Sequence, residues 1–133
     1  MKSSESIKNL ADAFVKAQMQ MEGAEKGSNN PFFKSKYADL NSVIEAVKGP
    51  LNNNGLSYTQ HPVSTERAVG VVTRIMHVSG EWIEEEFTMP LTKADPQASA
   101  SLISYSRRYA LQSICGIPAV DDDGEKAVLR GRN

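Results

Sequence analysis

The residues best suited to bind a ligand lie in one short segment, residues 104–111, with the sequence SYSRRYAL. Within it, Tyr105 and Tyr109 lie four positions apart and flank the adjacent Arg107 and Arg108. Arginine supplies a fixed positive charge and a planar guanidinium group, and tyrosine supplies a flat ring. A single nucleic-acid strand offers phosphates and unstacked base faces, which are the groups that these side chains bind. The segment therefore predicts a surface for a single nucleic-acid strand.

A second segment carries the same mixture of side chains earlier in the chain. Lys34, Lys36 and Tyr37 follow a stretch rich in Gly, Asn and Pro and precede a predicted helix. The N-terminus of a helix attracts anions, because its free backbone N–H groups and its dipole both favour negative charge. We therefore expect these three side chains to contact a nucleic-acid strand, although a plain solvated loop would explain the same residues.

The helix expected to contain residues 104–111 leaves a structural alternative open. On a helical projection, Tyr105 and Tyr109 share an arc with apolar residues, so both rings could belong to the core. Arg107 projects between apolar positions and needs an anionic partner, which is either a phosphate or a carboxylate from the aspartates at 121–123. Arg108 faces the polar side of the helix and is the better ligand candidate.

The formal net charge of −1 conceals an uneven distribution of charge. Half of the sixteen acidic residues fall in two short clusters, at positions 81–86 and 121–125. The rest of the chain carries fifteen basic residues against eight acidic ones, and the stretch from Lys26 to Ala38 holds three lysines and no acid. A local positive groove is therefore compatible with the overall acidity. Charges scattered over a solvated surface would give the same totals.

Hydrophobic periodicity predicts two helices in the first part of the chain. The first carries apolar residues at helical spacing over residues 7–21, with Ser3 or Ser4 as its N-cap. The second begins after Asp39, a favourable N-cap residue, and ends at the Asn-rich turn before Gly55.

From residue 56 onward the periodicity changes to that of strands, which we place at 56–64, 67–78 and 82–91. A long helix follows, with Asp95 as its N-cap and Gly116 at its end.

This order of elements predicts the fold class. We expect a single α+β domain over residues 1–120, in which a three-stranded antiparallel β-meander is flanked by two N-terminal helices and a long C-terminal helix. The core would therefore have the order β-β-β-α. The acidic tail at residues 121–133 is expected to be mobile.

The sequence contains no recognisable catalytic centre. Cys115 is the only cysteine, the two histidines lie apart, and no phosphate-binding glycine motif is present. The aspartates at 121–123 lack the alternating ligand spacing of a calcium loop. We therefore expect no enzymatic activity, no metal and no cofactor. A magnesium-dependent nuclease that uses these aspartates is the weakest alternative.

Two further features bear on the location of the protein. A lone cysteine cannot form an internal disulfide, which favours a reducing, cytoplasmic setting. No apolar run approaches the length needed to span a membrane, so we expect no membrane partner.

Three segments together resemble the ERF (essential recombination function) family of phage single-strand annealing proteins. They are residues 30–40, with the sequence NPFFKSKYADL, then residues 50–56, and residues 104–117. The resemblance covers roughly residues 5–126, and its motifs occur in the family's order and spacing. Ser104 stands where the family commonly has threonine, and many members carry a further C-terminal region.

The resemblance implies an ATP-independent protein that binds single-stranded DNA and anneals complementary strands as a ring or helical filament. The DNA-binding residues that it implies are four cations for phosphates and three tyrosines for bases: Lys34, Lys36, Arg107, Arg108, Tyr37, Tyr105 and Tyr109. It also implies a bacterial host cell, where a host single-strand-binding protein or a phage exonuclease would be further partners.

The net acidity of the chain supports a different interpretation. The arginine-bearing helix would then pair with the acidic clusters of another copy, which gives an oligomeric protein-interaction module without annealing activity.

Overall fold

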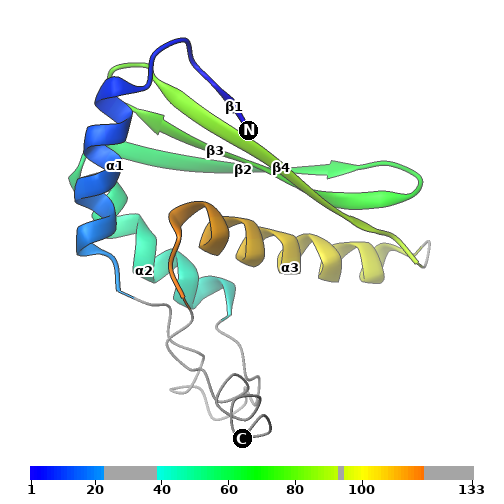
Figure 1. Cartoon of the computed structure of the whole chain (residues 1–133). Helices are drawn as coiled ribbons and strands as arrows, with labels where there is room; N and C mark the ends of the chain where they lie inside the picture. The colour runs from blue at the N-terminus through cyan, green and yellow to red at the C-terminus, as the bar shows by residue number, and fades with distance from the viewer. Residues whose placement is uncertain (23–38, 93–94, 119–133) are drawn as a thin grey trace, which may run out of the picture.

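The computed structural model describes residues 1–22, 39–92 and 95–118. These residues form an α+β domain with the element order β1 (Lys2–Ser3), α1 (Lys8–Gln20), α2 (Leu40–Asn53), β2 (Leu56–Ser64), β3 (Ala68–His77), β4 (Trp82–Pro90) and α3 (Pro96–Cys115). The strands form one antiparallel sheet in the order β1-β4-β3-β2. Helices α2 and α3 cover one face of this sheet, and α1 closes one end (Figure 1). The α+β class and the β-β-β-α order are as the sequence predicts.

The sheet has four strands rather than the three expected from the sequence. The additional strand, β1, pairs with β4 through Lys2 opposite Glu84 and Ser3 opposite Ile83. A strand of two residues has no alternating pattern to recognise, because its pairing depends on a partner far away in the chain. The Ser4 hydroxyl extends the contact by accepting the N–H of Trp82 at 3.0 Å.

The expected cap of the first helix is therefore wrong. The Ser4 hydroxyl is hydrogen-bonded to β4 and does not cap the helix. Ile7 occupies the N-cap position of α1 and makes no side-chain hydrogen bond there. The backbone N–H of Leu10 instead donates a hydrogen bond to the Glu81 carboxylate at 2.7 Å. The side-chain amide of Asn9 donates to the second oxygen of the same carboxylate at 3.0 Å. The turn before β4 thus caps α1 from a distance that no local sequence pattern reveals.

The other helix ends follow the sequence closely. The Asp39 side chain accepts the N–H of Ser42 at 2.7 Å, and Asp95 accepts the N–H of Ala98 at 2.9 Å. Gly116 ends α3 in the left-handed conformation with φ of +68°. Residues close in the sequence therefore determine where α2 begins and where α3 begins and ends.

The two faces of the sheet differ in their side chains. Val69, Val71 and Ile75 of β3 face the helices and are fully buried. On the opposite face, the guanidinium of Arg74 lies 4.1 Å from the ring centroid of Trp82 and forms a 2.9 Å ion pair with Glu84. The core consequently lies on the helix side, where apolar residues from α1, α2, β2, β3 and α3 form one cluster.

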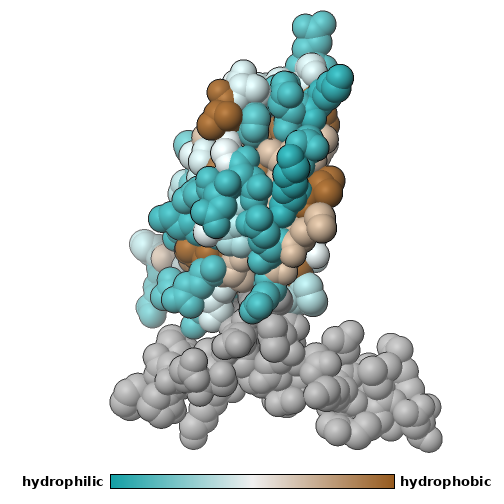
Figure 2. All heavy atoms as spheres, turned by 90° about the vertical axis from the view of Figure 1, so that its left-hand side faces the viewer, coloured by the Kyte–Doolittle hydropathy of each residue, from teal (hydrophilic) through white to brown (hydrophobic). Residues whose placement is uncertain are grey.

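The end of the molecule that carries α1 presents mainly hydrophilic side chains (Figure 2). Val15 and Met19 are exposed on α1, at 58% and 82%, but hydrophobic side chains on this face occur as separate spots. Isolated apolar side chains of this kind are normal on a solvated surface. The α1 end therefore offers no continuous apolar patch on this face.

Candidate nucleic-acid interface

Helix α3 positions the tyrosine–arginine motif against the sheet. Ser106, Ala110 and Leu111 are buried, with Ser106 and Leu111 fully so. The small side chain of Ser106, whose hydroxyl donates to the Leu102 carbonyl at 2.7 Å, allows the helix to approach the sheet closely. The remaining residues of the motif lie on the flanks of α3 or on its outer side.

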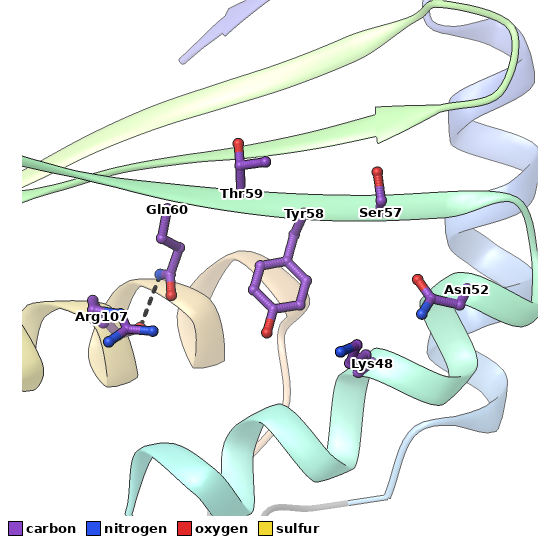
Figure 3. A pocket seen from close by; sticks show the side chains of 7 residues that line it. All are labelled: Lys48, Asn52, Ser57, Tyr58, Thr59, Gln60 and Arg107. Carbon is purple, nitrogen blue, oxygen red and sulfur yellow. Dashed lines mark hydrogen bonds between the residues drawn. The ribbon is translucent and has the colours of Figure 1, made fainter.

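Arg107 lies on the flank of α3 that faces α2 and β2. It lines a cavity of about 350 Å³, together with Lys48 and Asn52 of α2 and residues 57–60 of β2. The ring of Tyr58 projects from β2 into the space between Arg107 and Lys48 (Figure 3). We call this cavity the basic groove, because its two charged residues, Lys48 and Arg107, are both cations.

The electrostatics of the basic groove favour an anion. Among the described residues, no carboxylate forms a salt bridge with Lys48 or Arg107. Burial raises the pKa of the Tyr58 hydroxyl, and the positive charge of Arg107 acts in the opposite direction. The hydroxyl therefore stays protonated and can donate a hydrogen bond to a bound group.

Gln60 connects the basic groove to the sheet and to α3. Its amide nitrogen donates to the Thr73 hydroxyl at 3.0 Å. It also donates to the backbone carbonyl of Arg107 at 3.0 Å (Figure 3). Its buried carbonyl oxygen has no hydrogen-bond partner in the described part of the chain. Gln60 thus fixes the position of the Arg107 backbone, and its carbonyl oxygen is a buried polar atom.

The two tyrosines lie on the opposite flank of α3, beside β4. The ring centroid of Tyr109 is 5.0 Å from that of Phe87 and 6.0 Å from that of Tyr105, and both ring pairs are stacked. The guanidinium of Arg108 lies 4.9 Å from the ring of Tyr105. We call Phe87, Tyr109 and Tyr105 the aromatic stack. Tyr105 and Tyr109 are 42% and 45% exposed, so the interpretation of these rings as core residues is wrong.

A second cavity, of about 370 Å³, adjoins the aromatic stack between β4 and α3. Phe87, Tyr109 and Ile114 contribute much of its apolar lining, and Glu85 is an acidic residue at this site. The amino group of Met1 forms a 3.4 Å ion pair with Glu85. The two flanks of α3 therefore differ in chemistry. Lys48 and Arg107 lie beside β2, whereas the aromatic stack, Arg108 and the Met1–Glu85 ion pair lie beside β4.

The structure thus separates the predicted site residues into groups. It brings Tyr105, Arg108 and Tyr109 together and places Arg107 on the other side of the same helix. Lys34, Lys36 and Tyr37 lie outside the described residues, as do the aspartates at 121–123.

Sequence reasoning missed Lys48, Tyr58 and Gln60. A signal for two of them was present, because the helix-facing positions of β2 become polar after Leu56. A strand that packs on helices should carry apolar residues there, so the polar groups of Tyr58 and Gln60 were a signal for a groove, although the Tyr58 ring also packs against the core.

The comparison with protein families shows the family to which the chain belongs. The model described as the ERF superfamily matches residues 10–133. The chain belongs to the ERF superfamily. The match includes all three segments that carry the resemblance seen in the sequence, so that identification is confirmed.

Membership of the ERF superfamily indicates a role in phage recombination and a DNA partner. No curated protein and no solved structure matches this ERF-superfamily chain. Within residues 1–22, 39–92 and 95–118, no group of His, Cys, Asp and Glu side chains is arranged to hold a metal ion. In the same ranges, every helix is too short or too polar to cross a membrane.

Proposed function

We propose that this protein binds single-stranded DNA and anneals complementary strands in phage-type homologous recombination, without ATP or another cofactor. The observation that carries the proposal is the half-exposed stack of Tyr105 and Tyr109, with the Arg108 guanidinium against Tyr105. Every nucleobase has a flat face, so such a surface binds bases without regard to sequence, at about 1–3 kcal/mol per stacked base.

The basic groove supports the same proposal. Lys48 and Arg107 are the charged residues that line it, and phosphates are the anions that a DNA strand supplies in series. Lys34, Lys36 and Tyr37 complete the proposed set, with the two lysines on phosphates and the tyrosine on a base. Phosphate contacts make the affinity depend on salt, because each one releases condensed counterions.

The proposed mechanism needs no chemical step. A protein that holds the backbone and leaves the base edges accessible presents a strand for pairing with its complement. In a ring or helical filament, one long strand contacts many copies at once, so weak contacts at each copy add up. A host single-strand-binding protein or a phage exonuclease would supply or release such strands in the bacterial cytoplasm.

An annealing assay tests this function directly. Two complementary labelled oligonucleotides are mixed with the purified full chain, without ATP, over a series of salt concentrations. We expect pairing faster than the spontaneous rate, with the acceleration fading as salt rises, and no acceleration for a non-complementary pair. Assembly without DNA binding would instead favour a protein-interaction module. Binding without acceleration would limit the function to single-strand binding.

A further inference from the structure

Two side-chain amides bind backbone carbonyls of α3 in the described part of the chain. Gln18 of α1 donates to the carbonyl of Cys115 at 2.8 Å, at the end of α3, where helix carbonyls lack partners within the helix. Gln60 of β2 donates to the carbonyl of Arg107 at 3.0 Å. Arg107 lies inside the helix, where a carbonyl already accepts an N–H of the next turn, so the capping of a helix end does not explain this second bond.

Burial along α3 changes at the point where Gln60 contacts the helix. Residues 96–105 include no buried residue, and the buried residues of α3 are Ser106, Ala110, Leu111 and Cys115. Leu111 and Cys115 belong to the apolar cluster that also contains residues of α1 and α2. Apolar packing therefore fixes the second half of α3, and the bond from Gln60 to Arg107 holds the helix to β2 where that packing begins.

The same bond lies at the basic groove. Gln60 and Tyr58 project from β2 toward the helices, and the side chain of Arg107 lines the same cavity from α3 (Figure 3). Lys48 lines it from α2. A shift of α3 away from β2 would therefore change the separation of the two cations. A binding site needs supporting contacts that keep its charged groups at the spacing the ligand requires, and Gln60 makes such a contact.

Stability alone does not explain an amide at residue 60. The amide nitrogen also donates to the Thr73 hydroxyl at 3.0 Å, and Thr73 is 1% exposed. The amide oxygen of Gln60 is buried without a hydrogen-bond partner among the described residues, which is unfavourable. Replacing both partners of a buried hydrogen bond by apolar groups of the same shape is close to neutral or stabilising. An apolar pair at these two positions would therefore serve the stability of the core at least as well.

We infer that Gln60 is a positioning residue of the DNA site. Its bond to the Arg107 carbonyl sets where the middle of α3 lies relative to β2, and thereby holds the Arg107 guanidinium in the basic groove. Gln60 acts through Arg107 rather than through a contact of its own with DNA. The inference rests on the proposed function and deepens it, because it assigns part of the affinity to a contact between α3 and the sheet.

Replacing the polar pair by apolar residues separates positioning from stability. Gln60→Met together with Thr73→Val keeps similar side-chain shapes and removes the bond to Arg107. We expect the free energy of unfolding in urea to stay the same or to rise. For a fluorescent oligonucleotide, the slope of log affinity against log salt should fall by up to about 0.7, the share of one phosphate contact, which is about fivefold in affinity across a tenfold range of salt.

A double-mutant cycle shows whether Gln60 acts through Arg107. If the displaced guanidinium no longer contacts a phosphate, adding Arg107→Gln to the double substitution should weaken binding no further. Residues that act independently of each other give additive losses. Additive losses would therefore refute the positioning role.

Three further variants serve as matched controls. Gln18→Met removes the other amide bond to α3, away from the basic groove, so it should leave the salt slope unchanged whatever it does to stability. Thr73→Val alone leaves the bond from Gln60 to Arg107 in place and should also keep the wild-type slope. Gln60→Met alone should lower the slope as the double substitution does, and it carries the test if the double variant does not fold.

The outcomes separate this inference from the proposed function. If the wild-type chain does not bind the oligonucleotide, the proposed function fails, and the inference fails with it. If the wild-type chain binds and the Gln60→Met variants keep its salt slope, only the positioning role is refuted. If Gln18→Met lowers the slope as much as Gln60→Met does, the site needs general anchoring of α3 and Gln60 has no special part in it.

Discussion

Arg107 and Tyr109 are separated by one residue in α3 but lie on opposite flanks of that helix. Arg107 lines the basic groove beside β2, whereas Tyr109 stacks on Phe87 of β4 at 5.0 Å. Two positions on an α-helix differ by about 200° of rotation, so residues i and i+2 point in nearly opposite directions. Residues that look like one motif in the sequence therefore belong to two different surfaces.

The salt dependence of DNA binding should report on the basic groove. Lys48→Gln or Arg107→Gln removes one phosphate contact, which should weaken binding and reduce the slope of log affinity against log salt by about 0.7 per contact for a single strand. Fluorescence anisotropy with one oligonucleotide over a range of salt measures the slope. Lys16→Gln, on the exposed side of α1, makes the same charge change and should leave the slope unaltered. Equal slopes for all three variants would remove the groove from the site.

Base stacking on the aromatic stack should depend on the ring and not on the hydroxyl. Tyr105→Ala should weaken oligonucleotide binding by about 1–3 kcal/mol, whereas Tyr105→Phe should retain most of the affinity. Because the ring is 42% exposed, the alanine variant should unfold at nearly the wild-type temperature. Titration at fixed salt and a thermal melt separate these effects. Equal affinities for the alanine and phenylalanine variants would show that Tyr105 does not stack a base.

Two glycine substitutions should differ strongly in their effect on stability. A Cβ at Gly70 would collide with the backbone carbonyl of Phe87, so Gly70→Ala should force β3 and β4 apart and lower the free energy of unfolding. Gly49 lies inside α2 with open space beyond its own helix, but it precedes Pro50, whose ring crowds the Cβ of a preceding helical residue and offsets the gain in helix propensity. Gly49→Ala should therefore change the free energy of unfolding by less than about 1 kcal/mol. Urea unfolding of both variants gives the two values. A stable Gly70→Ala protein would contradict the close approach of β3 and β4.

Stability should fall at high pH because Cys115 is buried. Burial raises the pKa of its thiol from 9.0 to about 12. The unfolded chain therefore loses this proton at a lower pH than the folded chain does. The resulting contribution to stability is fully present below pH 9 and is lost between pH 9 and pH 12, at up to about 1.4 kcal/mol per pH unit.

Replacing the thiol should isolate this effect. Cys115→Ala lacks the ionisable group, so its free energy of unfolding should decline less steeply over the same pH range, whatever its absolute stability. The pKa of Tyr58 is also raised, mainly by burial and in smaller part by the charge of Cys115, so Cys115→Ala removes that smaller part together with the thiol. Chemical unfolding at several pH values between 8 and 10.5 compares the two. Parallel curves would show that Cys115 ionises as easily in the folded state as in the unfolded chain.

Features that depend on neighbouring residues were readable from the sequence. Asp39 and Asp95 cap their helices, Gly116 ends α3, and the meander from β2 to β4 lies where alternation places it. Each of these rests on hydrogen bonds or φ values within a few residues, which local residue types determine. The ERF resemblance rests on residue order alone, and the family match confirms it.

Features that depend on distant partners were not readable. Residues 2 and 3 form the strand β1 because they pair with β4. The N-terminus of α1 is capped by Glu81, which lies 71 residues along the chain from Leu10, its hydrogen-bond donor. Periodicity describes one element at a time and contains no information about its partners. The N-cap assigned to Ser3 or Ser4 failed for this reason.

The sequence by itself determined that two arginines and two tyrosines lie together on one helix, α3, which made them the candidates for DNA contact. Only the tertiary structure decided their grouping. The sheet covers one side of α3 and α2 packs beside it, so Arg107 joins Lys48 in the basic groove and Tyr109 joins Phe87 in the aromatic stack. The physical reason is that helical periodicity sets the angles between side chains, whereas the burial of apolar surface sets the orientation of the whole helix.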